Sequence, residues 1–264
     1  MLTNAENLKG LAIHATDGNI GKVEDFYFDS ESWAIRYLVV ETGGWLGGRR
    51  ILITPYSVLG VDWSSRRLNV SLTKRQVENS PDIDATKPVT RQQEAEYLNY
   101  YEYPYYWGGP YLWGQAFAPT PALLTNASPR TIVERVLTET AESHLRGSEA
   151  GTEYDIEAAD GEIGHMDSFI FEDHSWAIRY IEVATRNWWP GKKVLFSAAW
   201  VERISWRDSK FFVRLTRAAI SSAPEYFGSA LITREYEHAL YRHYGQPPYW
   251  TKEENREALV ISAV

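Results

Sequence analysis

Residues 17–42 read DGNIGKVEDFYFDSESWAIRYLVVET, and residues 160–185 read DGEIGHMDSFIFEDHSWAIRYIEVAT. Fourteen of these 26 positions are identical, and the offset of 143 residues continues without a gap to Trp107 and Trp250. A repeat of this length indicates that one structural unit occurs twice in the chain. The predicted division is a first copy at 1–107, a linker at 108–144, a second copy at 145–250 and a tail at 251–264.

Each copy has the sequence pattern of short antiparallel strands. In the first copy, the turn dipeptide Asp17-Gly18 precedes a predicted strand at 20–28, and a polar turn at 29–32 leads to a strand at 33–41. Residues 33–41 carry apolar side chains on both faces, which predicts a central strand buried on both sides. Further strands are predicted at 50–54, 58–62 and 67–72. Five or six short strands at this spacing favour a small barrel or sandwich.

Helices are predicted to be brief and to follow the strands. Thr73 and Thr90 each begin a capping pattern, and Thr233 begins the counterpart of the second helix, which Gly245 ends. The linker is rich in aromatic residues, Pro and Gly up to about residue 124. After it, Ile132 and Val136 lie on one stripe of a predicted helix. Because linkers seldom carry so many aromatic rings, we expect this one to pack on the barrels.

Composition excludes several classes of protein. The 264 residues include 27 Lys and Arg, 35 Asp and Glu, and no Cys, which gives a formal net charge of −8. The absence of Cys excludes disulfides, thiolate metal sites and a cysteine nucleophile. The acidic balance argues against a nucleic-acid partner. With no apolar stretch of about 18 residues and no signal-peptide pattern at the N-terminus, we expect a soluble, cytoplasmic protein without a membrane span.

The pattern DGxIGKVEDFxFD, followed by WAIRYLVV and by the later GRRILITP, resembles the PRC-barrel family. The resemblance covers residues 8 to about 73 and again 145 to about 216, and it is closest to tandem, soluble bacterial members. It implies two small, highly curved β-barrels whose roles are mostly non-catalytic, such as assembling a complex or docking on another protein. The matching positions are typical of turns and of the core, so the resemblance transfers no functional residue.

Candidate chemistry at the titratable residues is weak. The histidines lack the spacing of a metal site and are interpreted as surface residues; they are His14, His144, His165, His174, His238 and His243. Glu24 and Asp25 are adjacent on a strand and therefore face opposite ways. Ser57, Ser64 and Ser65 have no neighbouring His, and the glycine-rich stretch 43–48 lacks the Lys of a phosphate loop and is predicted to be a rim loop. We therefore predict no catalytic, cofactor-binding or metal-binding residue.

Buried arginines and the aromatic run are the more informative features. Arg36 and Arg179 lie in the most apolar strand of each copy and need a carboxylate or carbonyl partner. We expect a structural pairing with an acid such as Glu24 or Asp167 on the neighbouring strand; the alternative is a contact with a partner protein. Trp33, Trp63, Trp176 and Trp206 are interpreted as core or inter-barrel packing. The run YLNYYEYPYYWGGPYLW at 97–113 either covers apolar barrel surface or binds a partner through its Tyr and Trp side chains.

These observations predict a mainly β protein with two PRC-like barrels in tandem, each followed by a short helix. Because both copies present the same packing faces, we expect the barrels to be related by a pseudo-two-fold axis. The predicted function is non-enzymatic: a scaffold or adaptor that binds a protein, with homo-oligomerisation also open. The alternatives are a small-ligand sensor with a pocket between the barrels and a ribosome- or RNA-associated factor.

Overall fold

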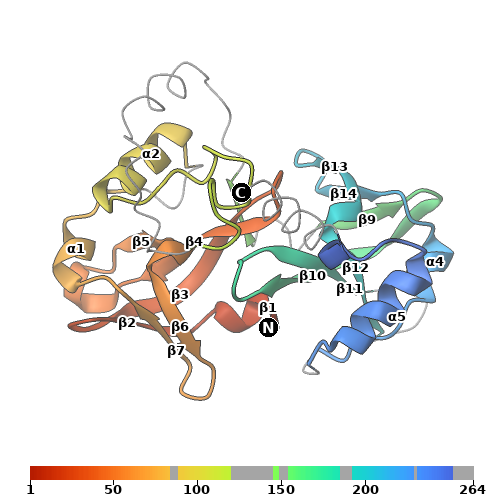
Figure 1. Cartoon of the computed structure of the whole chain (residues 1–264), viewed down its shortest axis with the longest axis horizontal. Coiled ribbons are helices and arrows are strands. Elements are labelled where there is room, and N and C mark those ends of the chain that lie inside the picture. Colours follow the sequence, from red (N-terminus) through yellow and green to blue (C-terminus); the bar gives the residue numbers. More distant parts are fainter. Residues whose placement is uncertain (84–88, 120–144, 149–153, 185–191, 229–230, 252–264) are drawn as a thin grey trace, which may run out of the picture. The chain divides into compact units, whose positions relative to one another are not determined.

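The computed structural model describes residues 1–83, 89–119, 145–148, 154–184, 192–228 and 231–251. These form two compact units, which are shown in Figure 1. Unit 1 comprises Met1, 3–152 and 169–179, and unit 2 comprises Leu2, 153–168 and 180–264. The helix predicted on Ile132 and Val136 and all of the predicted tail except Thr251 lie outside the described residues.

Unit 1 contains an antiparallel sheet with one parallel pair. Its strand order is β5-β4-β3-β2-β7-β6, and β8 pairs with β3 off this path. The strands are β2 (Ala12–Ala15), β3 (Gly18–Asp29), β4 (Ala34–Glu41), β5 (Arg50–Ile53), β6 (Val58–Asp62), β7 (Arg67–Val70) and β8 (Leu145–Gly147). The parallel pair is β2 with β7. Among the described residues no ladder joins β5 to β6, so the described strands do not form a closed barrel.

Unit 2 repeats this arrangement. Its strand order is β12-β11-β10-β9-β14-β13, with β1 (Leu2–Asn4) pairing β10, and β14 and β9 are again parallel. The strands are β9 (Asp155–Ala158), β10 (Gly161–Glu172), β11 (Ile178–Ala184), β12 (Lys193–Ser197), β13 (Val201–Ser205) and β14 (Lys210–Val213). All six pairs of equivalent strands begin within one residue of the 143-residue offset. The prediction of a mainly β protein with two similar units in tandem is confirmed; the pseudo-two-fold axis stays a prediction.

Strand β4 is the centre of the unit 1 core. It lies between β3 and β5, and every residue from Ala34 to Val40 is buried, as the apolar character of both faces predicted. On one side Tyr37 meets Tyr97 edge to face, with ring centroids 5.4 Å apart. The side chains of Phe26 and Phe28, on β3, pack against Phe169.

The helices begin and end where local chemistry places them. In unit 1 these are α1 (Lys74–Glu78) and α2 (Arg91–Tyr100), and in unit 2 they are α4 (Arg217–Ser221) and α5 (Arg234–Tyr244). Thr73 and Thr90 form full capping boxes with the glutamine three residues later. Thr233 caps the start of α5, and Gly245 ends it in the left-handed conformation with φ of 63°.

The hairpin turn between β10 and β11 packs within unit 1, although its sequence belongs to the second repeat. The amide of Ile35 donates to the Trp176 carbonyl (2.9 Å), and the amide of Ile178 donates to the Trp33 carbonyl (2.7 Å). Trp33 and Trp176 occupy equivalent turns, and both have positive φ, 53° and 58°. By their spatial contacts residues 169–179 therefore belong to unit 1, whereas by sequence they belong to the second repeat.

Candidate functional site

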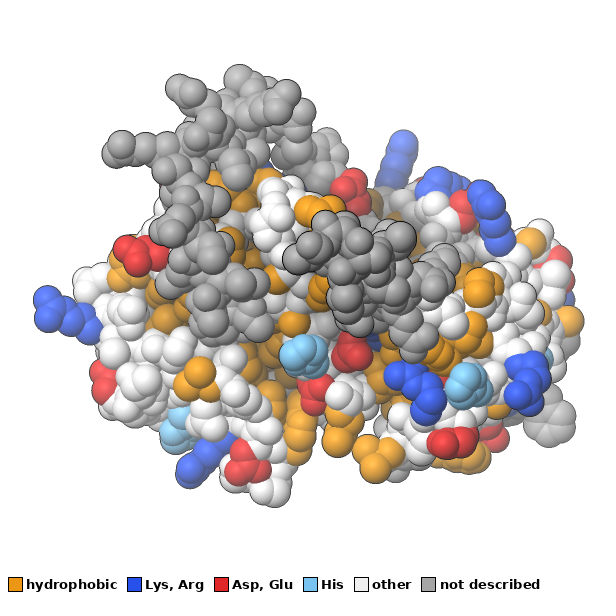
Figure 2. Space-filling view, viewed as in Figure 1, with side chains coloured by type: hydrophobic (Ala, Val, Ile, Leu, Met, Phe, Trp, Pro, Cys, Tyr) orange, Lys and Arg blue, Asp and Glu red, His pale blue; other side chains and the backbone are white. Residues whose placement is uncertain are grey.

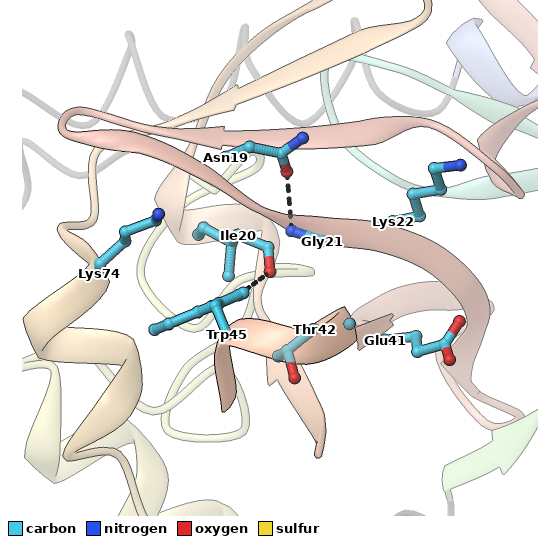
Figure 3. A pocket seen from close by; sticks show the side chains of 9 residues that line it. Asn19, Ile20, Gly21, Lys22, Glu41, Thr42, Trp45 and Lys74 are labelled. Atoms are coloured by element: carbon cyan, nitrogen blue, oxygen red, sulfur yellow. Dashed lines mark hydrogen bonds between the residues drawn. The ribbon is translucent and has the colours of Figure 1, made fainter. Parts of the chain in front are cut away.

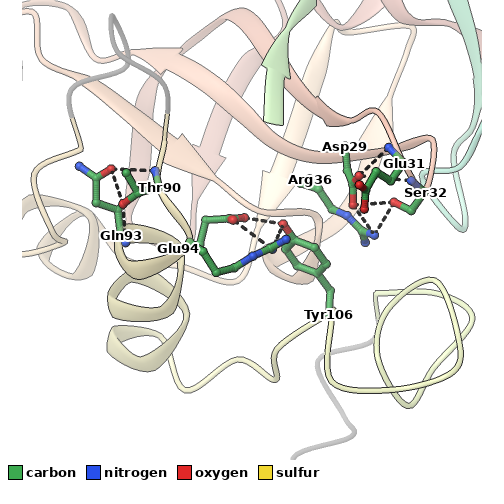
Figure 4. Close-up of polar contacts among 9 residues, drawn as sticks. Asp29, Glu31, Ser32, Arg36, Thr90, Gln93, Glu94 and Tyr106 are labelled. Atoms are coloured by element: carbon green, nitrogen blue, oxygen red, sulfur yellow. Dashed lines mark hydrogen bonds and ion pairs between the residues drawn. The ribbon is translucent and has the colours of Figure 1, made fainter. Parts of the chain in front are cut away.

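The Arg36 side chain is buried in a polar cluster at the β3–β4 turn (Figure 4). Its guanidinium donates to the Ser32 hydroxyl (2.8 Å) and to the Leu112 carbonyl (2.8 Å), and it lies 3.5 Å from an Asp29 carboxylate oxygen. The guanidinium carbon also lies 3.9 Å from the centroid of the Tyr106 ring. Every element of this cluster belongs to unit 1.

The predicted acid partners of the buried arginines are wrong. Glu24 pairs instead with Arg50, and Asp167 pairs with Lys193. The Arg36 side chain extends along its own hairpin to the turn, where Asp29 begins the loop and accepts hydrogen bonds from two loop amides. Burial acts to raise the pKa of Asp29, but the Arg36 charge and the hydrogen bonds from Ser32 and Glu31 outweigh it, so the pKa is lowered.

The second repeat contains the same cluster at the 143-residue offset. A guanidinium nitrogen of Arg179 lies 2.6 Å from a Glu172 oxygen, and the Ser175 hydroxyl donates to the same oxygen. In each repeat, an acid, a serine and an arginine of the same hairpin therefore contact one another at the turn. The geometry of both clusters fits a structural role, because the acid, the serine and the arginine of each hairpin pair with one another.

A second buried cluster attaches helix α2 to the sheet (Figure 4). The Glu94 carboxylate accepts a hydrogen bond from the Tyr106 hydroxyl (2.5 Å) and lies 3.1 Å from Arg91. Burial raises the pKa of Glu94 to about 7, against the opposing influence of Arg91 and of the hydrogen bond from Tyr106. In unit 2, Glu237 pairs with Arg234 in the same way.

The aromatic run at 97–113 covers the sheet of unit 1 with its largest side chains. Tyr97 is buried, and its hydroxyl donates to the Leu52 carbonyl (2.8 Å) while accepting from the Thr54 amide (3.3 Å). Trp113 is 1 % exposed and donates its indole N–H to the Ser175 carbonyl (2.7 Å). Of the two predicted uses of this run, the structure supports the covering of apolar surface for these side chains.

The remaining polar residues singled out in the sequence lie apart from one another. Ser64 and Ser65 donate to Asp62, and the Ser57 hydroxyl lies 3.1 Å from that of Tyr103. Asp25 accepts a hydrogen bond from Ser148. In the described part of the chain no group of three or more His, Asp and Glu side chains is placed to hold a metal ion; His144 lies outside that part.

One open groove lies where the glycine-rich loop meets the start of β3 (Figure 3). It measures about 490 Å³ and includes Lys22, Glu41, Trp45 and Lys74 in its lining. Residues 43–46 form a 3₁₀ turn, as expected for a rim loop rather than a phosphate loop. The Trp45 indole N–H donates to the Ile20 carbonyl, and the Lys74 ammonium lies 5.2 Å from the centroid of the Trp45 ring. The Trp45 side chain therefore already contacts groups of its own chain.

A second groove, here called the β6 groove, follows the outer strand of the unit 1 sheet. It measures about 390 Å³, and Figure 1 shows the β6–β7 hairpin that forms one side projecting from the rest of the sheet. Its lining is mostly apolar and contains no Lys or Arg: Pro55, Val58, Leu59, Gly60, Val61, Trp63, Ala118, Pro119, Asp173, His174 and Trp176. Leu59 is 63 % exposed. Neither groove is lined by a member of the two buried clusters.

On the face drawn in Figure 2, the described Lys and Arg side chains lie in small separate groups, with Asp and Glu among them. No helix in the described residues is both long enough and apolar enough to cross a membrane.

Residues 3–77 match the family model of the PRC-barrel domain. The chain therefore carries a PRC-barrel domain, in its first repeat, as the sequence pattern predicted. This match does not cover the second repeat, whose likeness rests on the internal identity and on the equivalent order of strands. The PRC-barrel domain is a general protein-interaction and assembly module. A search of the curated proteins found no match.

Sequence reasoning placed β6 correctly but missed the β6 groove. The strand was predicted at 58–62, and nothing in its own residues shows that it ends the sheet. A usable signal was present in the repeat, because Leu59 of the first copy is replaced by Glu202 in the second.

Proposed function

We propose that this protein is a non-enzymatic scaffold or adaptor that binds a partner protein through the β6 groove. The observation that carries the proposal is an outer strand with an exposed leucine beside a mostly apolar groove. Concave sites lined mainly by apolar side chains are where proteins commonly bind other molecules. The general role of the PRC-barrel domain in assembly supports the same conclusion.

The arrangement of charge also favours binding over catalysis. Catalytic acids and bases act from a cleft that substrate reaches. Here the buried charged groups Arg36 and Glu94 are paired with neighbours in clusters that line neither groove. Their energetic role is to hold turns and helices against the sheet.

The test uses a photo-crosslinking amino acid in place of Leu59 in the full chain, expressed in its native cell. The matched control carries the same group in place of Leu231, which is 70 % exposed. We expect one protein to be crosslinked from position 59 and not from 231, and the purified partner to bind the purified chain. The proposal fails if no protein is crosslinked from position 59. A small molecule that raises the melting temperature, or RNA binding with steep salt dependence, would then favour one of the two alternative functions.

A further inference from the structure

In the described part of the chain, no strand pairs with the outer edge of β6, so this edge can accept another strand. β6 is the last strand in the order of its sheet, and its ladder is with β7. Outside that ladder, the Val58 amide donates to the Pro55 carbonyl at the end of the preceding 3₁₀ turn, and among the described residues no ladder pairs 59–62 with a strand other than β7. The unpaired N–H and C=O groups of an edge strand are a template for pairing with another chain, at a spacing of about 4.8 Å. The β6 groove provides space along this edge.

The second repeat supplies an internal comparison. Strand β13 ends the unit 2 sheet as β6 ends that of unit 1, and it begins and ends at the same repeat positions. At the position of Leu59 it carries Glu202, which pairs with Arg214 at 2.7 Å. At the position of Gly60 it carries Arg203, whose guanidinium carbon lies 3.7 Å from the Phe212 ring centroid. Charged side chains are a common means of blocking an edge strand, so β13 is blocked where β6 is open.

The lining of the β6 groove indicates what chemistry the added strand has. Its apolar members suit β-branched and other apolar side chains. Its ionisable members are Asp173 and His174, without a Lys or Arg, and the whole chain has a net charge of −8. The Asp173 carboxylate already pairs with the Met1 ammonium, and an acidic side chain in the added segment would meet no Lys or Arg in the groove lining. The net negative charge of the chain would also repel it.

We propose that the β6 groove binds an extended segment of the partner protein that is rich in apolar and β-branched residues, lacks Asp and Glu, and adds to β6 as a further strand. This inference rests on the proposed function and specifies its mode of binding. Main-chain hydrogen bonds to β6 supply affinity, and the groove selects the side chains.

The test transfers the blocked edge to β6 through the double variant Leu59→Glu with Gly60→Arg. A Cβ at Gly60 meets no atom within 4 Å, so the arginine fits without displacing its surroundings. The control is Leu231→Glu. The probes are 12-residue peptides selected from a random displayed library on the immobilised full-length protein, then synthesised and titrated against each variant.

We expect the selected peptides to be apolar and free of acidic residues, to bind the double variant at least about tenfold more weakly, and to bind the control unchanged. Bound peptide should slow hydrogen exchange of backbone amides within Val58–Asp62. Equal affinity for the double variant, or slowed exchange only elsewhere, overturns strand addition while leaving the proposed function intact. A third outcome is that the wild type binds no peptide but self-associates, and that the double variant does not self-associate. This outcome overturns addition of a partner's strand, because the occupant of the groove is then a second copy of this chain. Failure of the proposed function is separate: no protein is then crosslinked from position 59.

Discussion

Replacing Glu94 with glutamine should remove a pH dependence from the stability of unit 1. Glu94 is 2 % exposed and has a folded-state pKa of about 7, against 4.5 for an ordinary glutamate. A carboxyl whose pKa is raised by folding binds its proton more tightly in the folded state. Its contribution to stability is therefore fully present below pH 4.5 and is lost as the pH rises through 7.

The size of this effect follows from the two pKa values. Each unit of pKa corresponds to about 1.4 kcal/mol, so the interval from 4.5 to about 7 corresponds to about 3 kcal/mol in the free energy of unfolding. Glutamine does not titrate and has nearly the shape of the protonated acid. The free energy of unfolding of Glu94→Gln minus that of the wild type should therefore rise by about 3 kcal/mol from pH 4.5 to pH 8. This rise does not depend on the absolute stability of the variant at either pH.

The assay is urea unfolding of wild type and variant at intervals of half a pH unit, with the difference in free energy plotted against pH. Glu96→Gln serves as the control, because Glu96 is an exposed residue of the same helix. An infrared band of a protonated carboxyl that persists near pH 6 and is absent from Glu94→Gln would provide direct evidence. A difference curve for Glu94→Gln that is flat over this range would refute the reasoning, because the side chain would then titrate alike in both states.

Three further outcomes follow from the described contacts. Arg36→Met should destabilise the protein by about 3–5 kcal/mol in urea unfolding, since it leaves Asp29 buried without its cation, whereas Arg214→Met, at an exposed pair, should cost less than about 1 kcal/mol. Gly21→Ala should lower the melting temperature, at a cost of about 1–3 kcal/mol, because its Cβ would lie 2.0 Å from the Glu41 carbonyl oxygen; Gly44→Ala, with no atom within 4 Å, should have little effect. Tyr97→Phe should cost about 1–3 kcal/mol by removing the hydroxyl that joins the Leu52 carbonyl and the Thr54 amide, and equal melting temperatures would contradict that.

Local chemistry made much of the fold predictable. The capping boxes at Thr73 and Thr90 depend on residues three apart, and the Gly245 cap depends on one residue's freedom at positive φ. The predicted strand at 58–62 has the observed bounds of β6 because the turns beside it are specified by neighbouring residues. Such features are determined within a few residues, and a single sequence reports them well.

Features that depend on distant residues were not predictable in the same way. Arg36 was assigned an acid on the neighbouring strand, but its side chain reaches the turn acid Asp29 and the Leu112 carbonyl, 76 positions away. The packing of residues 169–179 in unit 1 likewise depends on contacts with Trp33 and Trp113 that no local pattern encodes. The β6 groove belongs to the same class, because a strand is an edge only once every other strand has found its place.

The duplication of the unit within one chain indicates where binding occurs. Features that a unit needs in order to fold are expected in both copies, and the acid–arginine pairs do occur in both: Arg36 with Asp29 is matched by Arg179 with Glu172, and Arg91 with Glu94 by Arg234 with Glu237. A binding surface is under no such requirement and can be open in one copy and blocked in the other. The edges of β6 and β13 differ in this way. The two strands have equivalent bounds, but the positions that are Leu59 and Gly60 in the first repeat are Glu202 and Arg203 in the second. The difference between the two halves, rather than their likeness, therefore directs attention to the β6 groove.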